Sequence, residues 1–379
     1  MISPTRSVKT FLASFLILFA GVLLRANAAP PRDWEPQRTW VFVVGVLEWQ
    51  HPDMFDSFPK ENRRDSQLVD FFRRQGVPGE QIVFLKDSQA TTRSVRSSFP
   101  ALLAKTRPND LLFFYYTGHG YKSDDARQTF FATYDDGENV DGWATEEIIR
   151  NIEKYFRGSR ALLTADTCYS GNLGVQAQRL GRRVSYASLT SSSSSQQSTG
   201  NWTFTEMLLA GMHGKSFADV NGDGEVSLAE LAEDIKEDMA FAEGQRSTFV
   251  TTGGFPNDML LAPAERKVNP LVSRRVEVRS EGDWYKARII DADGAKYLVH
   301  YYGYEDWDDE WVKPQQIREL RASAYAAGAQ VEVNWHGKWY PARVIKVERG
   351  VHLIHYVGFD DGWDEWVNGQ RIRRAGSRN

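Results

Sequence analysis

Over the first 263 residues, apolar and polar positions alternate in the pattern of strands and helices. Short apolar runs bounded by turns indicate buried strands, and apolar residues that recur every three or four positions indicate helices. The helical pattern is clear at 62–75, where Leu68, Val69, Phe71 and Phe72 share one stripe. The expected strands are 40–47, 81–85, 111–117, 160–165 and 184–189, and the expected helices are 62–75, 91–105, 145–156 and two that begin at Thr203 and Ser227. This alternation predicts an α/β domain with a parallel sheet covered on both faces.

A serine-rich segment and a linker interrupt this alternation of strands and helices. The serine-rich composition of residues 191–195 favours a mobile loop. The α/β domain is expected to span 39–263 and to be followed by a linker at 264–274.

Beyond the linker the chain is aromatic and β-rich, and it repeats itself after 55 residues. The shift superposes Val276-Glu277-Val278 on Val331-Glu332-Val333, Trp284-Tyr285 on Trp339-Tyr340, His300-Tyr301 on His355-Tyr356, and Glu310-Trp311-Val312 on Glu365-Trp366-Val367. The sequence therefore predicts two copies of one small β domain, at 275–320 and 329–375.

The first 28 residues have the pattern of a secretory signal peptide. Arg6 and Lys9 precede an apolar stretch at 11–24, and the small-residue pattern Ala26-Asn27-Ala28 follows it. Cleavage before Ala29 would export the protein to the periplasm or the medium. An uncleaved anchor is the alternative, although the stretch is short for a membrane span. After cleavage, we expect no stable membrane span.

Composition narrows the classes of partner and of stabilising bond. With 379 residues, of which 41% are hydrophobic, the chain can form two or three packed domains. A net charge of −4 argues against electrostatic binding of nucleic acid, which needs a clustered basic face. The single cysteine cannot form a disulfide within the chain, so its thiol is expected to have another use.

That cysteine and one histidine each follow an expected strand. His119 comes after the apolar run 111–116, and Cys168 comes after 161–163. Taken singly, each residue is more often part of a core than a catalyst. However, the carboxyl ends of parallel strands converge, and an imidazole that removes a thiol proton makes a nucleophile. The pair therefore predicts a cysteine hydrolase.

Two sequence blocks carry a resemblance to a known family. Tyr115-Tyr116-Thr117-Gly118-His119-Gly120 and Asp166-Thr167-Cys168-Tyr169-Ser170-Gly171 resemble the active-site blocks of the caspase and metacaspase peptidases. Asp-Thr-Cys is similar to the metacaspase and bacterial branches, since animal caspases carry Gln-Ala-Cys there. Over 39–263 the resemblance implies a caspase-like three-layer αβα sandwich with a mostly parallel sheet.

The resemblance also implies roles for individual residues. Cys168 would attack the peptide carbonyl, His119 would act as acid and base, and the backbone N–H groups of Cys168 and Gly120 would receive the oxyanion. Catalysis would need no cofactor. Asp166 would lie in the pocket for the residue that precedes the cut, where a carboxylate favours Lys or Arg. The alternative is that Asp166 only forms a hydrogen bond at the strand end.

Three arginines suggest a second hypothesis about processing. Arg179, Arg182 and Arg183 follow the nucleophile block, in the segment where many family members are cut during maturation. Self-cleavage there is one interpretation. A solvated surface run of arginines is the alternative.

Residues 219–230 fit the twelve-residue calcium loop of EF-hand proteins, with oxygen ligands at alternate positions and Gly224 sixth. The expected ligands are Asp219, Asn221, Asp223, Glu225 through its backbone carbonyl, and Glu230. EF-hands normally occur in pairs, and no second loop is found in the sequence. The alternative is therefore a metal-free turn before a helix.

The two β repeats are similar to the Tudor-knot, chromo-barrel class of small β-barrels. The residues that carry this similarity are Trp284-Tyr285 with Tyr301, Trp307 and Trp311, and Trp339-Tyr340 with Tyr356, Trp363 and Trp366. Such aromatics form either a core or a cage for a methylated ammonium, which the neighbouring acids Asp306, Asp308, Asp309, Asp361 and Asp364 would favour. The repeats would otherwise dock a peptide or a cell-surface ligand, or pack within the molecule.

Together these features predict an exported, caspase-like cysteine endopeptidase that cuts protein or peptide substrates after Arg or Lys with a Cys-His dyad. The alternative is a non-catalytic binding or scaffold protein that acts through its tandem aromatic repeats. Retention of both His119 and Cys168 favours the enzyme.

Overall fold

The computed structural model describes residues 32–138, 140–266, 269–319, 325–348 and 350–376. The expected signal peptide, 1–28, lies outside these residues. Within them, no helix is long and apolar enough to cross a membrane.

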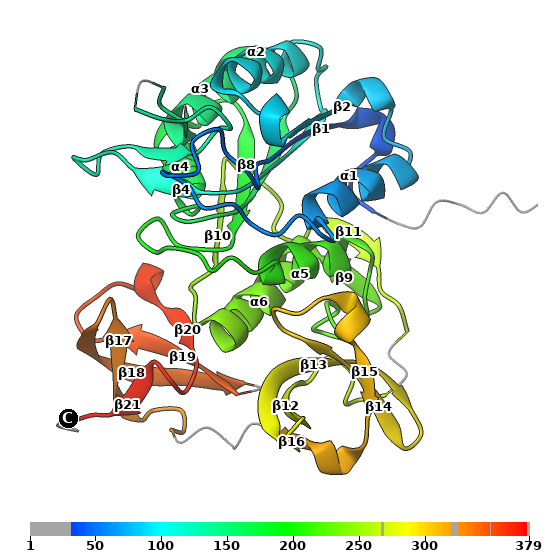
Figure 1. The fold of residues 1–379 in the computed structure, drawn as a ribbon, viewed down its shortest axis with the longest axis vertical. Coiled ribbons are helices and arrows are strands. Elements are labelled where there is room, and N and C mark those ends of the chain that lie inside the picture. Colours follow the sequence, from blue (N-terminus) through cyan, green and yellow to red (C-terminus); the bar gives the residue numbers. More distant parts are fainter. Residues whose placement is uncertain (1–31, 139, 267–268, 320–324, 349, 377–379) are drawn as a thin grey trace, which may run out of the picture. The chain divides into compact units, whose positions relative to one another are not determined.

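A six-stranded sheet forms the centre of the α/β domain (Figure 1). Its order is β10-β8-β7-β3-β1-β2, and only β10, at the edge, runs antiparallel to its neighbour. The strands are β1 Thr39–Gly45, β2 Ile82–Lys86, β3 Leu111–Thr117, β7 Arg160–Asp166, β8 Ser185–Thr190 and β10 Thr248–Thr252. The five predicted strands are confirmed, and β10 was not predicted.

Three helices cover each face of the sheet. Alternate residues of β1 point into two separate cores: Val41 and Val43 pack with α1, α5 and α6, whereas Phe42 and Val44 pack with α2, α3 and α4. The helices are α1 Arg64–Arg74, α2 Thr92–Leu103, α3 Thr145–Tyr155, α4 Asn172–Leu180, α5 Thr203–Met212 and α6 Leu228–Asp238. The three-layer αβα sandwich is therefore confirmed, with α4 as a helix that the pattern did not predict.

Two small sheets extend this domain near the expected functional segments. The first follows β3 and consists of β4 Gly120–Lys122, β5 Thr129–Phe131 and β6 Trp143–Ala144. The second pairs β9 Glu225–Ser227, in the expected calcium loop, with β11 Leu260–Pro263. Both sheets therefore fix loops that carry candidate site residues.

The serine-rich segment 191–195 forms the expected loop, and its first three residues are buried. Ser191 and Ser192 have no exposed surface. The Ser191 hydroxyl accepts a hydrogen bond from the backbone N–H of Thr167 (3.1 Å), and the Ser192 carbonyl accepts one from Gly171 (2.9 Å). The hydroxyl-rich sequence therefore supports the loop that contains Cys168 through its buried residues Ser191 and Ser192.

The C-terminal region contains two five-stranded antiparallel sheets with the same strand order, β15-β14-β13-β12-β16 and β20-β19-β18-β17-β21. The first consists of β12 Arg275–Ser280, β13 Asp283–Asp293, β14 Lys296–Tyr301, β15 Glu310–Val312 and β16 Ile317–Glu319; the second consists of β17 Gln330–Trp335, β18 Lys338–Glu348, β19 Val351–Tyr356, β20 Glu365–Val367 and β21 Ile372–Arg374. Even the irregularity after Ile289 in β13 recurs after Val344 in β18. The predicted pair of barrel-like domains is confirmed.

A fully buried charge cluster joins the first repeat to α6. Arg275 of β12 and Arg288 of β13 contact the acids Asp234, Glu237 and Asp238 of that helix. The Arg288 guanidinium lies 2.8 Å from Asp234 Oδ2 and 2.8 Å from Asp238 Oδ1. Because buried charges are costly unless they are paired, these contacts favour the observed arrangement of the two elements.

The second repeat provides a natural comparison, because Arg343 occupies the position equivalent to Arg288 and is exposed. We expect Arg288→Ala to lower the free energy of unfolding by roughly 3–5 kcal/mol, because the buried carboxylates Asp234 and Asp238 each lose one of their two arginine partners. Arg343→Ala should change it by about 0.5 kcal/mol or less, as is usual for surface positions. Urea denaturation of both variants measures the difference, and equal losses would contradict the role of the cluster.

Candidate active site

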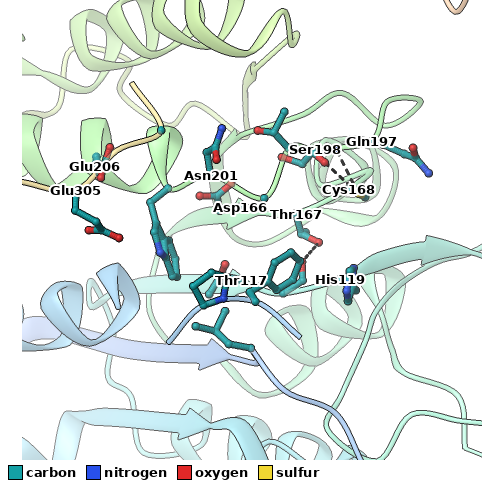
Figure 2. A pocket seen from close by; sticks show the side chains of 18 of the residues that line it. Thr117, His119, Asp166, Thr167, Cys168, Gln197, Ser198, Asn201, Glu206 and Glu305 are labelled. Carbon is teal, nitrogen blue, oxygen red and sulfur yellow. Dashed lines mark hydrogen bonds between the residues drawn. The ribbon is translucent and has the colours of Figure 1, made fainter. Parts of the chain in front are cut away.

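The pairing of β3 with β7 brings His119 and Cys168 together at the carboxyl ends of these two central strands. Thr117 is paired with Asp166, and the two candidate residues each follow two positions later. Both line one cavity of about 360 Å³, shown in Figure 2. The structure thus brings together two residues that are far apart in the sequence.

The imidazole of His119 has a defined tautomer. Its Nε2 lies 2.8 Å from the backbone carbonyl oxygen of Asp56, and a carbonyl can only accept a hydrogen bond. Nε2 therefore donates, and in the neutral ring Nδ1 keeps its lone pair. The rings of Trp49 and Phe58, with centroids 4.6 and 4.7 Å from the imidazole, restrict its orientation. The Asp56 carbonyl is the orienting group that the sequence did not reveal, because any residue type supplies a backbone carbonyl.

The Cys168 thiol is half-buried and is held by the segment that contains Ser198. The Ser198 N–H lies 3.2 Å from the sulfur, and the Ser198 carbonyl oxygen lies 3.8 Å from it. Burial raises the pKa of the thiol, and hydrogen bonds with the backbone of Ser198, Cys168 and Gly120 partly oppose this effect. The Cys168 side chain is therefore a thiol at rest, and it would need a base to become a nucleophile.

A glutamine side chain fixes the position of Ser198 and so of the thiol. Gln245 accepts a hydrogen bond from the backbone N–H of Thr199 and donates one to Ser198 Oγ (3.2 Å). The sequence pattern did not identify Gln245, because it follows a helix in no recognised motif.

The backbone around Cys168 is tightly constrained. Tyr169 has a φ of +59°, which a non-glycine residue adopts only where its surroundings enforce it. The Thr167 hydroxyl donates to the carbonyl of Gly118 (2.7 Å) and so ties the two sequence blocks together. A Cβ at Gly120 would overlap the carbonyl oxygen of Cys168. Only glycine therefore permits this approach of the two strand ends.

Asp166 is buried and lines the same cavity. Its Oδ2 accepts a hydrogen bond from Thr205 Oγ1 (2.7 Å), which is also 2.6 Å from the hydroxyl of Tyr115. Burial raises the pKa of Asp166 to about 7, although the hydrogen bonds from Thr205 and Ser191 lower it. Asp166 thus forms a hydrogen bond at the end of β7 and also lines the cavity, while its place in a pocket for the residue that precedes the cut stays a prediction.

The arginines expected at a self-cleavage segment are ordered in part. Arg179 lies in the last turn of α4, with a guanidinium nitrogen 2.6 Å from Glu146 Oε2. Arg183 donates to the backbone carbonyls of Ile152 and Glu153. Self-cleavage at this segment stays a prediction.

In the expected calcium loop, three carboxylates converge. One oxygen each of Asp219, Asp223 and Glu230 lies within 4.8 Å of the others. Asp219 accepts hydrogen bonds from the backbone N–H groups of Gly222 and Gly224 (2.7 and 3.0 Å). Glu230 also forms a capping box with Ser227 at the start of α6. Like-charged oxygens held this closely suit a hard cation. The donor set therefore fits calcium.

The second repeat contains an aromatic cage, but its members differ from those expected. A cavity of about 150 Å³ is lined by Trp335, Tyr340, Tyr356, Phe359 and Trp363. Trp339 and Trp366 are not among these residues. The Arg373 guanidinium lies 4.1 Å from the Trp339 ring, and Trp366 is buried against Ala240 and Phe241.

The first repeat lacks two walls of this cage. Ser280 and Asp308 occupy the positions of Trp335 and Trp363, which leaves the tyrosines Tyr285, Tyr301 and Tyr304. Trp307 and Trp311 are exposed and do not complete it. Of the expected acids, Asp306 and Asp309 instead contact Arg64 and His300, and Asp364 contacts His355.

Comparison with known proteins finds two domain families in the C-terminal region and a metacaspase similarity over part of the chain. The family model described as Agenet domain matches residues 274–321, and the model described as Tudor-knot, the RNA-binding-activity knot of a chromodomain, matches residues 326–374. Two curated proteins named Metacaspase-1, from Candida albicans and Lodderomyces elongisporus, are 25% identical to this chain; each match covers 28% of this chain and 28% of the relative. The chain combines a metacaspase-like region with Agenet and Tudor-knot domains.

Similar solved structures include the Geobacter sulfurreducens protein GSU0716, which covers 60% of this chain and all of that chain at 13% identity and a TM-score of 0.43. The four MBT repeats of Drosophila melanogaster Sfmbt, in complex with a methylated-lysine peptide, cover 27% of this chain and 36% of that chain at 16% identity and a TM-score of 0.14. Arabidopsis thaliana AGDP1 AGD34 covers 27% of this chain and 82% of that chain at 21% identity and a TM-score of 0.13. At these scores the structures add no argument about function.

The raised pKa of the thiol gives a direct test of this site. Because burial disfavours the thiolate, alkylation of Cys168 by iodoacetamide should show a higher apparent pKa in the folded protein than in the urea-unfolded chain. Alkylation rates between about pH 6 and 10, a range that spans the ordinary cysteine value, measure both. A folded value below the unfolded one would contradict the neutral resting thiol.

Proposed function

We propose that the protein is a caspase-like cysteine endopeptidase that cuts peptides after Arg or Lys through a dyad of Cys168 and His119. The observation that carries the proposal is that the two side chains line one cavity, in which the tautomer of His119 leaves Nδ1 as the proton acceptor. The metacaspase similarity supports the same class of reaction. Export by residues 1–28 remains part of the proposal.

In the first step, His119 Nδ1 takes the proton of Cys168 and the sulfur forms a bond to the peptide carbonyl carbon. The π electrons move to the oxygen, which accepts hydrogen bonds from the backbone N–H groups of Cys168 and Gly120. Donors fixed in advance stabilise charge that appears only in the transition state. The close approach of Gly120 to Cys168 supports this pairing of donors.

In the second step, the intermediate collapses and the carbon–nitrogen bond breaks. The leaving amine takes the proton from His119, and a thioester remains on Cys168. His119 then removes a proton from water, and the water oxygen forms a bond to the thioester carbon. The carbon–sulfur bond breaks, the carboxylic acid product leaves, and the thiolate takes the proton back from His119. The hydrogen bond to Asp56 and the neighbouring aromatic rings hold the imidazole during both transfers.

Substrate choice at the residue that precedes the cut is assigned to Asp166. Its pKa of about 7 means that an empty pocket holds a carboxyl that ionises near neutrality. A cationic side chain favours the ionised form and is favoured by it in turn. Selectivity for Arg or Lys should therefore weaken as the pH falls below about 7.

The enzyme is tested with fluorogenic peptides that end in Arg, Lys or Asp. We expect hydrolysis after Arg and Lys, a loss of at least about a hundredfold in kcat/KM for Cys168→Ala and for His119→Ala, and a selective loss on basic substrates for Asp166→Asn. Preferred cleavage after Asp would contradict the basic specificity. Silence of a folded wild-type protein on all peptides would contradict the enzyme.

We further propose that the loop at 219–230 binds calcium. Asp219, Asn221, Asp223 and Glu230 would supply side-chain oxygens, and Glu225 would supply its backbone carbonyl. Calcium would neutralise the convergent carboxylates and stabilise the start of α6, whose far end contacts the first repeat.

Calorimetric titration with calcium tests this site. Glu230→Gln should abolish the heat of binding, because the neutral amide loses a ligand charge while it can still complete the capping box. Glu225→Gln is the matched control and should bind calcium as the wild type does, because only its carbonyl is used. Absence of heat with the wild-type protein, or equal behaviour of the two variants, would contradict the proposal.

A second function, peptide binding through the cage of the second repeat, is favoured by a specific observation. The guanidinium of Arg246, from the α/β domain, lies 6.0 Å from the Trp335 ring centroid and 5.9 Å from that of Trp363. These aromatic faces thus already attract a cation. The ligand that suits five aromatic walls is a methylated ammonium group on a peptide.

Fluorescence anisotropy with trimethyl-lysine and unmodified peptides tests the cage. The trimethylated peptide should bind more tightly, and Trp363→Ala should weaken it about tenfold through loss of a cation–π wall. Trp307→Ala removes an exposed tryptophan of the first repeat and should have no effect. Equal binding of the two peptides would argue against the cage as a ligand site.

A further inference from the structure

The first repeat contributes to the candidate active-site cavity itself. Gly303, Tyr304 and Glu305, from the loop between β14 and β15, line it together with Asp166 and Cys168. Figure 2 draws Asp166 between Cys168 on one side and the glutamates Glu206 and Glu305 on the other. A domain outside the α/β fold therefore forms one wall of the cavity.

This wall is fixed by specific contacts. Arg64 of α1 is buried, and its guanidinium lies 2.8 Å from Asp306 Oδ1, the residue after Glu305, and 2.7 Å from Glu206 Oε1. Asn62 donates a hydrogen bond to Glu305. The Gly303 backbone packs so closely on Asn201 that a Cβ would lie 3.2 Å from its amide nitrogen. The loop is therefore placed by both charge and shape.

The cavity is acidic, and its two glutamates differ in how far they are compensated. Its lining contains three carboxylates, Asp166, Glu206 and Glu305, and neither Lys nor Arg. Arg64 and His300 both contact Glu206. Burial opposes ionisation of His300, but hydrogen bonds with Asp309 and Glu206 outweigh it and raise its pKa to about 10. Glu206 is therefore paired with two cations.

Glu305 is less compensated. It lies 3.7 Å from Arg64, whose charge Glu206 and Asp306 share at shorter distances, and its side chain is 26% exposed. A partly exposed carboxylate in a cavity without lysine or arginine favours a cationic group. We propose that the first repeat completes the substrate cavity and that Glu305 contacts a cationic side chain of the bound peptide. This side chain is either the one that precedes the cut, which Asp166 also contacts, or a second one nearby. This inference rests on the proposed peptidase function.

The test uses two pairs of fluorogenic peptides in the full-length protein. One pair carries Arg or its neutral isostere citrulline at the residue that precedes the cut, and the other pair carries them one residue earlier. Glu305→Gln should lower the Arg-over-citrulline ratio of kcat/KM about tenfold at one of the two positions. Gln can still accept the hydrogen bond from Asn62, so the fold is preserved.

Glu281→Gln is the matched control, because Glu281 is exposed in the same repeat and does not line the cavity. The control should leave both ratios unchanged. If wild-type protein cleaves but the two variants give the same ratios at both positions, this inference is overturned while the peptidase stands.

If the wild-type protein cleaves nothing, binding separates the two proposals. Labelled Arg and citrulline peptides are titrated into Cys168→Ala protein with and without Glu305→Gln. A loss of about tenfold in affinity for the Arg peptide alone supports the role of Glu305. Equal affinities, or no binding by either protein, overturn it.

Discussion

The parallel pairing of β3 with β7 is the constraint on which the site depends. Because Thr117 and Asp166 are in register, the chain emerges from both strands at the same edge, and His119 and Cys168 follow after equal distances. A slip of one residue would turn every side chain of a strand to the opposite face of the sheet. The hydrogen bond from the Thr167 hydroxyl to the Gly118 carbonyl then holds the two strand ends together. Any chemistry of the thiol therefore requires this strand register and the glycine at position 120.

Buried ion pairs fix the position of the first C-terminal repeat. The two repeats share strand order, core positions and even the His-to-acid hydrogen bonds of His300 and His355. What distinguishes them is their surroundings, because Arg288 is enclosed by the acids of α6 and its counterpart Arg343 is exposed. The first repeat is thereby built into the α/β domain and reaches its cavity. The second keeps the aromatic cage. One duplicated fold therefore supplies two different surfaces.

Much of the fold could be predicted because buried parallel strands are continuous apolar runs; β3 was placed at 111–117 without error. The edge strand β10 was missed because its residues are only half-buried and lack that pattern. In the site, the sequence identifies His119, Cys168 and Asp166 by residue type, whereas the Asp56 carbonyl is a backbone group. The cage residue Trp335 was missed because Ser280 replaces it in the first copy, so the repeat comparison did not mark that position. Phe359 was missed although its counterpart, Tyr304, is also aromatic.

The most direct test of the central claim is covalent labelling of the single cysteine with peptidyl acyloxymethyl ketones, followed by intact-mass spectrometry. The account predicts one adduct, formed faster by an arginyl than by an aspartyl probe, absent in Cys168→Ala and slowed in His119→Ala. Because the chain has one cysteine, a thiol adduct identifies Cys168 without further mapping. Equal rates for the two probes, no faster than with the urea-unfolded chain, would contradict an active site at this cavity.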